Sequence, residues 1–360
     1  MSMVDTTYRF TRNIGNSYTL YAGQIIQLDQ AREVGALLRF SDVDSTQLAD
    51  FESARLRIFH RSFTDSLVPP SEPFTLERIN PGLGDTIWTE TDTNFFEFPS
   101  TDLIYSAVMK DSDSVLVFLG SQSIDTLRMD YLEFTVGLQL LLDWRSGVEA
   151  NNGFLLRAPL GSDLVSFYSS ESTRRPYLVV DYFADDTTEA GDDTTSSSYY
   201  LVTQDISVYP TLVNDIPDDG RLLLNRSEGH RVHIDFKIPF DSLEARPIAG
   251  GRLVFNVDHS ATMMLASALV LQVWLRTEPR AQGDSNLISY PPAFTYQAHS
   301  DSLVYTLASL TSLLVDYQND PRDNYGFDLV VQATNHDFDR LVLHGPRLEI
   351  VYAVPFGAGE

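Results

Sequence analysis

The sequence lacks cysteine, and it has little lysine: of its 25 basic residues, only Lys110 and Lys237 are lysines. The missing cysteine excludes disulfides, thiolate zinc sites and cysteine nucleophiles. The seven histidines show no metal-ligand spacing, and the motifs of zinc proteases, serine hydrolases, P-loop proteins and dinucleotide-binding proteins are absent. No apolar run approaches the roughly 18 residues of a membrane-spanning helix. The sequence therefore does not support the common catalytic, metal-centre or membrane-spanning classes.

Basic charge is scarce relative to acidic charge. The 50 acidic residues give a net charge of -25, and the sequence pI is about 4.4. Binding a phosphate backbone requires many Lys and Arg side chains, so we expect no nucleic-acid partner. Aspartate outnumbers glutamate, 35 to 15. Adaptation to high salt and a GC-rich genome both explain this bias.

An acidic, Ser/Thr-rich stretch, Ala184 to Ser198, interrupts the otherwise globular composition of the 360-residue chain. A segment so poor in bulky apolar residues is typical of a solvated linker. The sequence therefore predicts a first domain over residues 1–183, a linker over 184–198 and a second domain over 199–360.

The two halves contain similar segments in the same order, which indicates a diverged tandem duplication. The matched pairs are ALLRF (36–40) with VHIDF (232–236), ARLRIF (54–59) with GRLVF (251–255), YLEFTVGLQLLLDW (131–144) with SLVYTLASLTSLLVDY (302–317), NNGF (151–154) with NYGF (324–327), and RPYLVVDY (175–182) with GPRLEIVY (345–352).

Most of these segments read as short strands. In ARLRIF, apolar and charged side chains alternate, as expected for a half-buried strand. The exceptions are the leucine-rich segments at 135–144 and 308–317, which have the spacing of a short one-faced helix. We therefore predict an all-β protein with two tandem jelly-roll-like β-sandwich domains, each with one short helix.

The first half also resembles a known family. The order of LLRF, ARLRIF, Trp88-Thr-Glu90, a helix ending in Trp144, NNGFLL, FYSSES and RPYLVVDY is similar to that of the DNRLRE domain family, over most of residues 20–183. The second half keeps the paired early strands, the helix, NYGF and the closing strand, and has Tyr317 in place of the tryptophan. The resemblance implies a β-sandwich, export, a cell-surface or polysaccharide-associated role, and no catalysis by the domain itself.

Aromatic residues in loops and strands are the candidates for ligand contact, because aromatic faces stack on the C–H faces of sugar rings. We select Tyr168, Trp274, Tyr290 and Tyr296, and we expect Trp88 and Trp144 to lie in the core. Calcium prefers oxygen ligands, so the acidic pairs Asp42/Asp44 and Asp111/Asp113 are candidates for a structural calcium site. Solvated loop acids in a very acidic protein are the simpler explanation, and no other cofactor is expected.

These observations favour an exported, non-catalytic protein at the cell surface or outside the cell, whose partner is a polysaccharide. The alternative is a structural subunit of a surface layer or filament, whose partners are other copies of itself; an accessory enzyme is a third reading. Residues 1–20 alternate polar and apolar residues without a counterpart in the core strands of the second half. This arm is either a strand added to the sheet edge of a neighbour, a first strand of the sandwich, or a frayed terminus. No signal-peptide pattern is present at the start, so we expect an export signal to precede it in the native protein.

Overall fold

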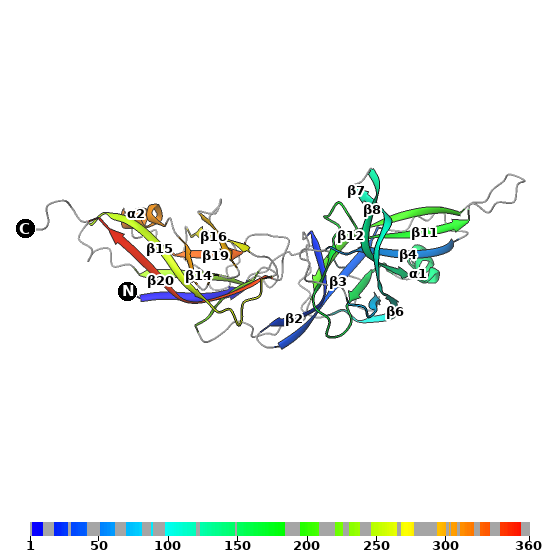
Figure 1. Cartoon of the computed structure of the whole chain (residues 1–360), viewed down its shortest axis with the longest axis horizontal. Coiled ribbons are helices and arrows are strands. Elements are labelled where there is room, and N and C mark those ends of the chain that lie inside the picture. Colours follow the sequence, from blue (N-terminus) through cyan, green and yellow to red (C-terminus); the bar gives the residue numbers. More distant parts are fainter. Residues whose placement is uncertain are drawn as a thin grey trace, which may run out of the picture. The chain divides into compact units, whose positions relative to one another are not determined.

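The computed structural model describes the following residues of the chain: 2–9, 18–27, 30–41, 51–61, 70–80, 88, 98–119, 123–147, 150–183, 195–208, 220–225, 230–237, 246–264, 268–276, 294–299, 302, 304–307, 310–319, 325–331 and 339–353. Within them, the fold is all-β with two short helices, which confirms the predicted fold class (Figure 1). The chain divides into two compact units: Met1–Arg12 with Leu212–Glu360, and Asn13–Thr211. We call these the split unit and the continuous unit.

The continuous unit is built on an 11-stranded antiparallel sheet that curls on itself, with the order β6-β5-β9-β3-β12-β11-β4-β8-β7, and with β2 and β10 paired beside β3. Its strands are β2 (Thr19–Gln27), β3 (Gln30–Phe40), β4 (Phe51–Phe59), β5 (Phe74–Ile79), β6 (Thr101–Ala107), β7 (Met109–Leu119), β8 (Ser123–Thr135), β9 (Phe154–Arg157), β10 (Val165–Tyr168), β11 (Tyr177–Phe183) and β12 (Thr195–Val208).

The split unit has a 9-stranded antiparallel sheet with the order β17-β16-β19-β14-β13-β20-β15-β18, and β1 pairs with β14. Its strands are β1 (Ser2–Arg9), β13 (Leu222–Asn225), β14 (His230–Lys237), β15 (Ile248–Val257), β16 (Ala268–Leu275), β17 (Phe294–His299), β18 (Val304–Leu307), β19 (Phe327–Val331) and β20 (Arg340–Tyr352).

Each unit has its own apolar core between the two curled parts of its sheet, and the alternating strands supply it. In β4, Ala54, Leu56 and Ile58 are fully buried in the core, whereas Arg55 and Arg57 between them face outward and are half-buried. This two-residue periodicity follows from the pleat of a strand. Burial of such side chains stabilises the fold by about 25 cal/mol for each Å² of apolar surface removed from water.

The two units repeat the same pairing scheme. Strand β9 lies between β3 and β5 in the continuous unit, and β19 lies between β14 and β16 in the split unit. Phe154 stands opposite Leu38, and Phe327 stands opposite Ile234. The predicted duplication is therefore visible as matched register, and the NNGF and NYGF segments occupy equivalent positions.

Both NGF segments are structural turns. Gly153 has φ 78° and Gly326 has φ 76°. A Cβ atom on either glycine would lie 2.1 Å from the carbonyl oxygen of Leu38 or 2.3 Å from that of Ile234. Only glycine adopts this left-handed conformation while its backbone approaches a neighbouring strand so closely. The shared motif therefore serves the fold of each unit.

The two helices, α1 (Leu138–Ser146) and α2 (Thr311–Asn319), confirm the predicted helical segments. Each buries a pair of leucines, Leu140 and Leu141 in α1 and Leu313 and Leu314 in α2. Trp144 of α1 packs against the core with its ring 5.3 Å from that of Phe154, and Tyr317 of α2 is buried at the matching position.

The sheets divide the chain at other positions than the predicted domain boundaries. Residues 195–198, placed in the linker, begin β12, and residues 199–208, placed in the second domain, continue it within the sheet of the continuous unit. Strand β1, placed in the first domain, pairs with β14 of the split unit. Polar composition misplaced the boundary because TSSSYYLV belongs to a long strand despite its three serines. The remaining predicted linker residues, 184–194, lie outside the described residues.

Candidate functional site

Strand β1 is the first candidate for function because it pairs with a segment more than two hundred residues away. All eight of its residues stand opposite β14 in an antiparallel register, from Ser2 opposite Lys237 to Arg9 opposite His230 (Figure 1). Strand β12 has the corresponding place in the continuous unit, where its second half pairs with β3 from Val202 opposite Phe40 to Val208 opposite Gly35. We call β1 and β12 the completing strands, because each adds a ladder partner to one of the equivalent strands β14 and β3.

The completing strands differ in length. The first half of β12 also pairs with β11, from Phe183 opposite Thr195 to Tyr177 opposite Leu201. The equivalent of β11 is the second half of β20, which pairs with β15. Among the described residues, no strand pairs with the other side of β20 from Pro346 to Tyr352, and Val351 there is 60% exposed. An unpaired edge of this kind offers backbone groups to another strand.

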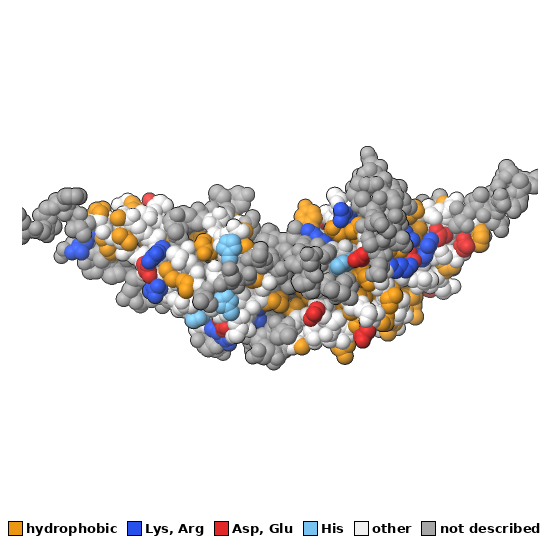
Figure 2. Space-filling model, viewed as in Figure 1, with side chains coloured by type: hydrophobic (Ala, Val, Ile, Leu, Met, Phe, Trp, Pro, Cys, Tyr) orange, Lys and Arg blue, Asp and Glu red, His pale blue; other side chains and the backbone are white. Residues whose placement is uncertain are grey.

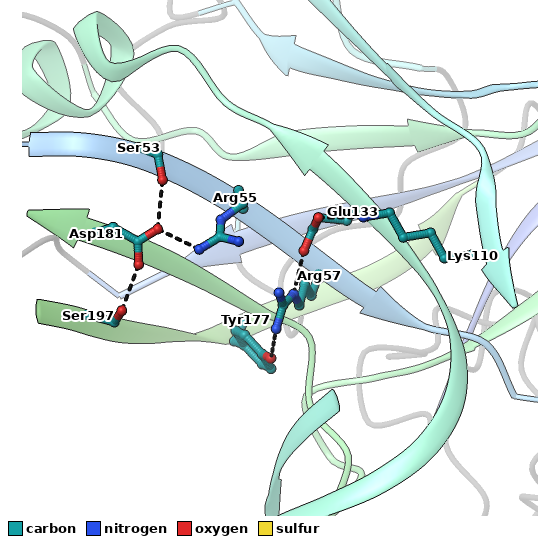
Figure 3. Close-up of polar contacts among 8 residues, drawn as sticks. All are labelled: Ser53, Arg55, Arg57, Lys110, Glu133, Tyr177, Asp181 and Ser197. Carbon is teal, nitrogen blue, oxygen red and sulfur yellow. Dashed lines mark hydrogen bonds and ion pairs between the residues drawn. The ribbon is translucent and has the colours of Figure 1, made fainter. Parts of the chain in front are cut away.

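A second candidate is the outward face of β4, β8, β11 and β12, which we call the outer face (Figure 3). Arg57 of β4 lies at its centre: the guanidinium donates to Glu133 of β8 at 2.7 Å and to the hydroxyl of Tyr177 of β11 at 3.1 Å. Lys110 donates to the other carboxylate oxygen of Glu133 at 2.6 Å. Residues from three neighbouring strands and from β7 thus form one connected ion-pair network.

The electrostatics of this network keep its charged groups charged. Burial alone would lower the pKa of Arg57, but the hydrogen bonds that its guanidinium donates to Tyr177 and Glu133, together with the charge of Glu133, raise that pKa above its ordinary value. Burial alone would raise the pKa of Glu133, and the hydrogen bonds from Lys110 and Arg57 outweigh it and lower that pKa. Each charged group therefore has a nearby partner of opposite charge or a hydrogen-bond partner. These contacts offset the free-energy cost of removing the charges from water.

Asp181 of β11 forms a second part of the outer face. Its carboxylate accepts from Ser53 at 2.7 Å, from Arg55 at 2.5 Å and from Ser197 at 2.6 Å, so it joins β4, β11 and β12 (Figure 3). Burial raises the pKa of Asp181, but these three partners lower it overall. The bond from Ser197 attaches the first half of β12 to the rest of the sheet.

Aromatic rings form a row across the same face. The ring of Phe59 lies 6.4 Å from that of Tyr131 and 5.7 Å from that of Tyr177, which in turn lies 5.7 Å from the ring of Tyr199. Phe59 and Tyr177 are fully buried, and Tyr199 is half-buried. In the region of β4 and β11, basic and acidic side chains lie beside apolar ones (Figure 2). Tyr199 is thus the ring of this row with the largest exposed part.

Tyr168, selected from the sequence, lies on β10 and is half-buried. The guanidinium of Arg174 lies 5.2 Å from its ring centre and also donates to its hydroxyl at 2.7 Å, and the guanidinium of Arg61 lies 5.4 Å from the same ring. Two cations therefore occupy positions where a sugar ring would stack.

Trp274 and Tyr296, also selected from the sequence, lie on neighbouring strands of the split unit but face opposite sides. Tyr296 of β17 stands opposite the buried Leu271 and packs against the core. Trp274 of β16 stands opposite Asp328, and its ring nitrogen donates to Gln272 at 3.2 Å on the outward side. They do not form one stacking platform, and Tyr168 belongs to the other unit.

The remaining selected residues lie outside the described part of the structure. This applies to Tyr290, Asp42 and Asp44, and also to the side chains of Asp111 and Asp113, although their backbone belongs to β7. Within the described ranges, no three His, Asp or Glu side chains are grouped so that they could hold a metal ion. Calcium at the two acidic pairs stays a prediction. Neither described helix has the length and apolar character that crossing a membrane requires.

Trp88 is buried, as expected for a core residue. Its ring nitrogen donates to the carbonyl of Asn152 in the NNGF turn at 2.7 Å, and Arg39 lies 5.4 Å from its ring centre. Trp88 therefore holds the NNGF turn through its ring nitrogen.

Sequence reasoning missed the completing strands and the outer-face network. The signal for the network was present in ARLRIF, where two arginines alternate with core residues. The signal for the completing strands was a short match between residues 5–7 and 205–207, which lies outside the longer segments that the two halves share.

Comparison with protein-family models, with curated proteins and with solved structures finds no match. The resemblance to the DNRLRE family therefore stays a prediction based on the quoted segments.

Proposed function

We propose that this protein is a non-catalytic structural subunit that assembles with copies of itself outside the cell. The observation that carries the proposal is the pairing of the whole of β1 with β14, which shows that an N-terminal strand serves a sheet formed far along the chain. Strands that add to a sheet edge through backbone hydrogen bonds are a general means of joining protein subunits. The unpaired edge of β20 provides a further position for such contacts among the described strands.

The surface chemistry is consistent with this role. In the outer-face network, Glu133 pairs with both Arg57 and Lys110, so its charged groups are paired with one another. These ion pairs connect neighbouring strands and stiffen the sheet. A large net negative charge keeps free subunits soluble, and this repulsion weakens when salt screens it. Assembly is therefore expected to increase with ionic strength.

The test is a concentration series of the full chain at low and high salt, followed by light scattering and electron microscopy. The proposal predicts elongated assemblies that grow with concentration, and a variant without residues 1–12 that forms fewer or shorter ones. A chain that stays monomeric at all concentrations and salt conditions would contradict the proposal.

Polysaccharide binding is the second candidate function, and the row of rings on the outer face favours it. Tyr199 is half-buried beside Tyr177, and the polar groups of Asp181 and Ser197 lie on the same strands. If this face binds sugar, Tyr199→Ala reduces retardation in polysaccharide-containing gels, whereas Tyr182→Ala on the opposite side of β11 does not. Equal mobility of the unmodified chain with and without polysaccharide would exclude the role for the glycans tested.

A further inference from the structure

The two completing strands occupy the same register in their sheets. The reference positions are Leu38 of β3 and Ile234 of β14, because each stands opposite the phenylalanine that follows its NGF glycine. Asp205 of β12 stands opposite Leu38, and Asp5 of β1 stands opposite Ile234. The two strands also run in the same direction, since both pair antiparallel with their partners.

The matched register aligns a common sequence, Asp-x-Ser/Thr. It comprises Asp205 and Ser207 in β12, and Asp5 and Thr7 in β1. Ser207 stands opposite Ala36, and Thr7 stands opposite Val232, which are again equivalent positions. A shared motif at a shared register indicates that β1 and β12 are copies of one element, so that the duplicated segment includes a completing strand ahead of each repeat.

In β12, this motif anchors the strand to the repeat that it completes. The carboxylate of Asp205 accepts from the backbone amide of Ser170 at 2.5 Å, and the hydroxyl of Ser207 accepts from the backbone amide of Tyr21 at 3.0 Å. Asp205 is 1% exposed and Ser207 is 9% exposed. Buried backbone amides need such acceptors, so the motif makes β12 specific for this sheet position.

The order of the elements along the chain assigns the partner. Strand β12 precedes the second repeat in the chain, which begins with β13, and it completes the repeat before it. Strand β1 precedes the first repeat, which begins with β2. If β1 follows the rule that β12 sets, the repeat it completes is the second repeat of a preceding copy.

We propose that β1 of one copy pairs with β14 of another, so that copies join head to tail with the same strand exchange that joins the two repeats within a chain. This inference rests on the proposed structural role and specifies its partner site. When β1 pairs with β14 of its own chain, it makes the same backbone contacts as it would with β14 of another copy. The chain then stays a monomer, because its β14 has no place for the β1 of a neighbour. The β1 of the same chain and the β1 of another copy compete for β14. Exchange between copies dominates once the protein concentration exceeds the effective concentration of the chain's own β1 near β14.

The test uses the absence of natural cysteine. Val4 and Asp235 are opposite each other in the β1–β14 register, so cysteines there are close enough for a disulfide. Chains with Val4→Cys and one tag are mixed with chains with Asp235→Cys and another tag, and oxidised at increasing concentration. The double variant Val4→Cys/Asp235→Cys checks the register. The matched control is Gln204→Cys/Arg39→Cys, at the equivalent pair of β12 and β3.

The inference predicts a disulfide between differently tagged chains whose yield rises with concentration, and a ladder of linked chains from the double variant. The control forms its disulfide within one chain at every concentration. Assemblies without the mixed disulfide would overturn the exchange of β1 and leave the structural role standing. A chain that neither assembles nor cross-links would contradict both, and a double variant that fails to cross-link would show that the register is wrong.

Discussion

The completing strand is longer in the continuous unit than in the split unit, and it pairs with more of the sheet there. In the continuous unit, β12 first pairs with β11 and then crosses to β3, so one strand completes both parts of the curled sheet. In the split unit, β1 pairs with β14 alone, and the second half of β20 keeps one side without a described partner. In both units the strand that pairs with β9 or β19 also pairs with a completing strand, but β12 is the next strand after β11, whereas the whole continuous unit separates β1 from the rest of the split unit in the chain.

The two units also differ in the exposure of the ion pairs on the outward faces of their sheets. The continuous unit has the network of the half-buried Arg57 and Glu133 with the buried Tyr177 on its outer face. At the corresponding face of the split unit, Arg252 and Arg347 contact Glu349, and their side chains are 58% and 67% exposed. We therefore expect substitutions on the two faces to have unequal effects, whereas substitutions in the duplicated turns should have equal ones.

The largest expected effect comes from the two turn glycines. Gly153→Val and Gly326→Val each force a side chain into a left-handed conformation and against a neighbouring carbonyl, which costs several times the roughly 1 kcal/mol of a usual substitution. Hydrogen exchange by mass spectrometry should show loss of protection in the continuous unit for Gly153→Val and in the split unit for Gly326→Val. A tolerated substitution at one glycine alone would break the equivalence of the two turns.

The next effect compares an ion pair on the outer face of the continuous unit with one on the corresponding face of the split unit. Arg57→Met removes the partner that Glu133 and Tyr177 share and should lower the free energy of unfolding of the continuous unit by about 2–4 kcal/mol, since a partly buried carboxylate then loses one of its two counter-ions. Arg252→Met, which removes an exposed partner of Glu349 in the split unit, should leave that unit essentially unchanged, because exposed pairs contribute little. Denaturant titration with unit-resolved hydrogen exchange measures the change in the free energy of unfolding of each unit. Equal decreases for the two variants would contradict the difference between the half-buried and the exposed ion pairs.

The smallest effect is pH-dependent. Burial lowers the pKa of His60, and the charge of Asp130 only partly offsets this. The unfolded chain then binds more protons than the folded chain, so this contribution to stability is complete above about pH 6.5 and is lost as the pH falls below it. The lowered pKa values of Glu133 and Asp181 add a further loss only below about pH 4.5. The melting temperature of the continuous unit should decrease from pH 7.5 to 5.5, and His60→Gln should flatten that slope; an unchanged slope would show that another group titrates.

Much of the fold could be predicted from the sequence, because its signals are local. The alternation in ARLRIF, the leucine spacing before Trp144 and the NGF turns depend on residues that are neighbours in the chain. The membership of β12 and β1 could not be predicted in this way, since it depends on pairing with strands formed by distant residues. Composition misled here: the serines that precede Tyr199 look like a linker, but they include Ser197, which binds Asp181 in the sheet.

The candidate site residues could likewise be predicted only where the signal was local in the sequence. Tyr168 and Trp274 have the residue type of sugar contacts, but their partners, Arg174 and Gln272, become neighbours only in the folded sheet and engage their polar groups. Sequence spacing cannot show that Trp274 and Tyr296 face opposite sides of two paired strands, because the register of the pair is set by the fold. The Asp-x-Ser/Thr motif became informative only once β1 and β12 were aligned by register.

The most direct test of the completing strands is hydrogen exchange on the full chain with one proline in each. Thr6→Pro and Ile206→Pro are matched, since Thr6 stands opposite His233 and Ile206 opposite Leu37. Proline removes a backbone donor and disrupts a ladder. Thr6→Pro should release the amides of residues 230–237 while the continuous unit keeps its protection, and Ile206→Pro should release those of residues 35–40. Unchanged protection of residues 230–237 in the Thr6→Pro chain would contradict the account.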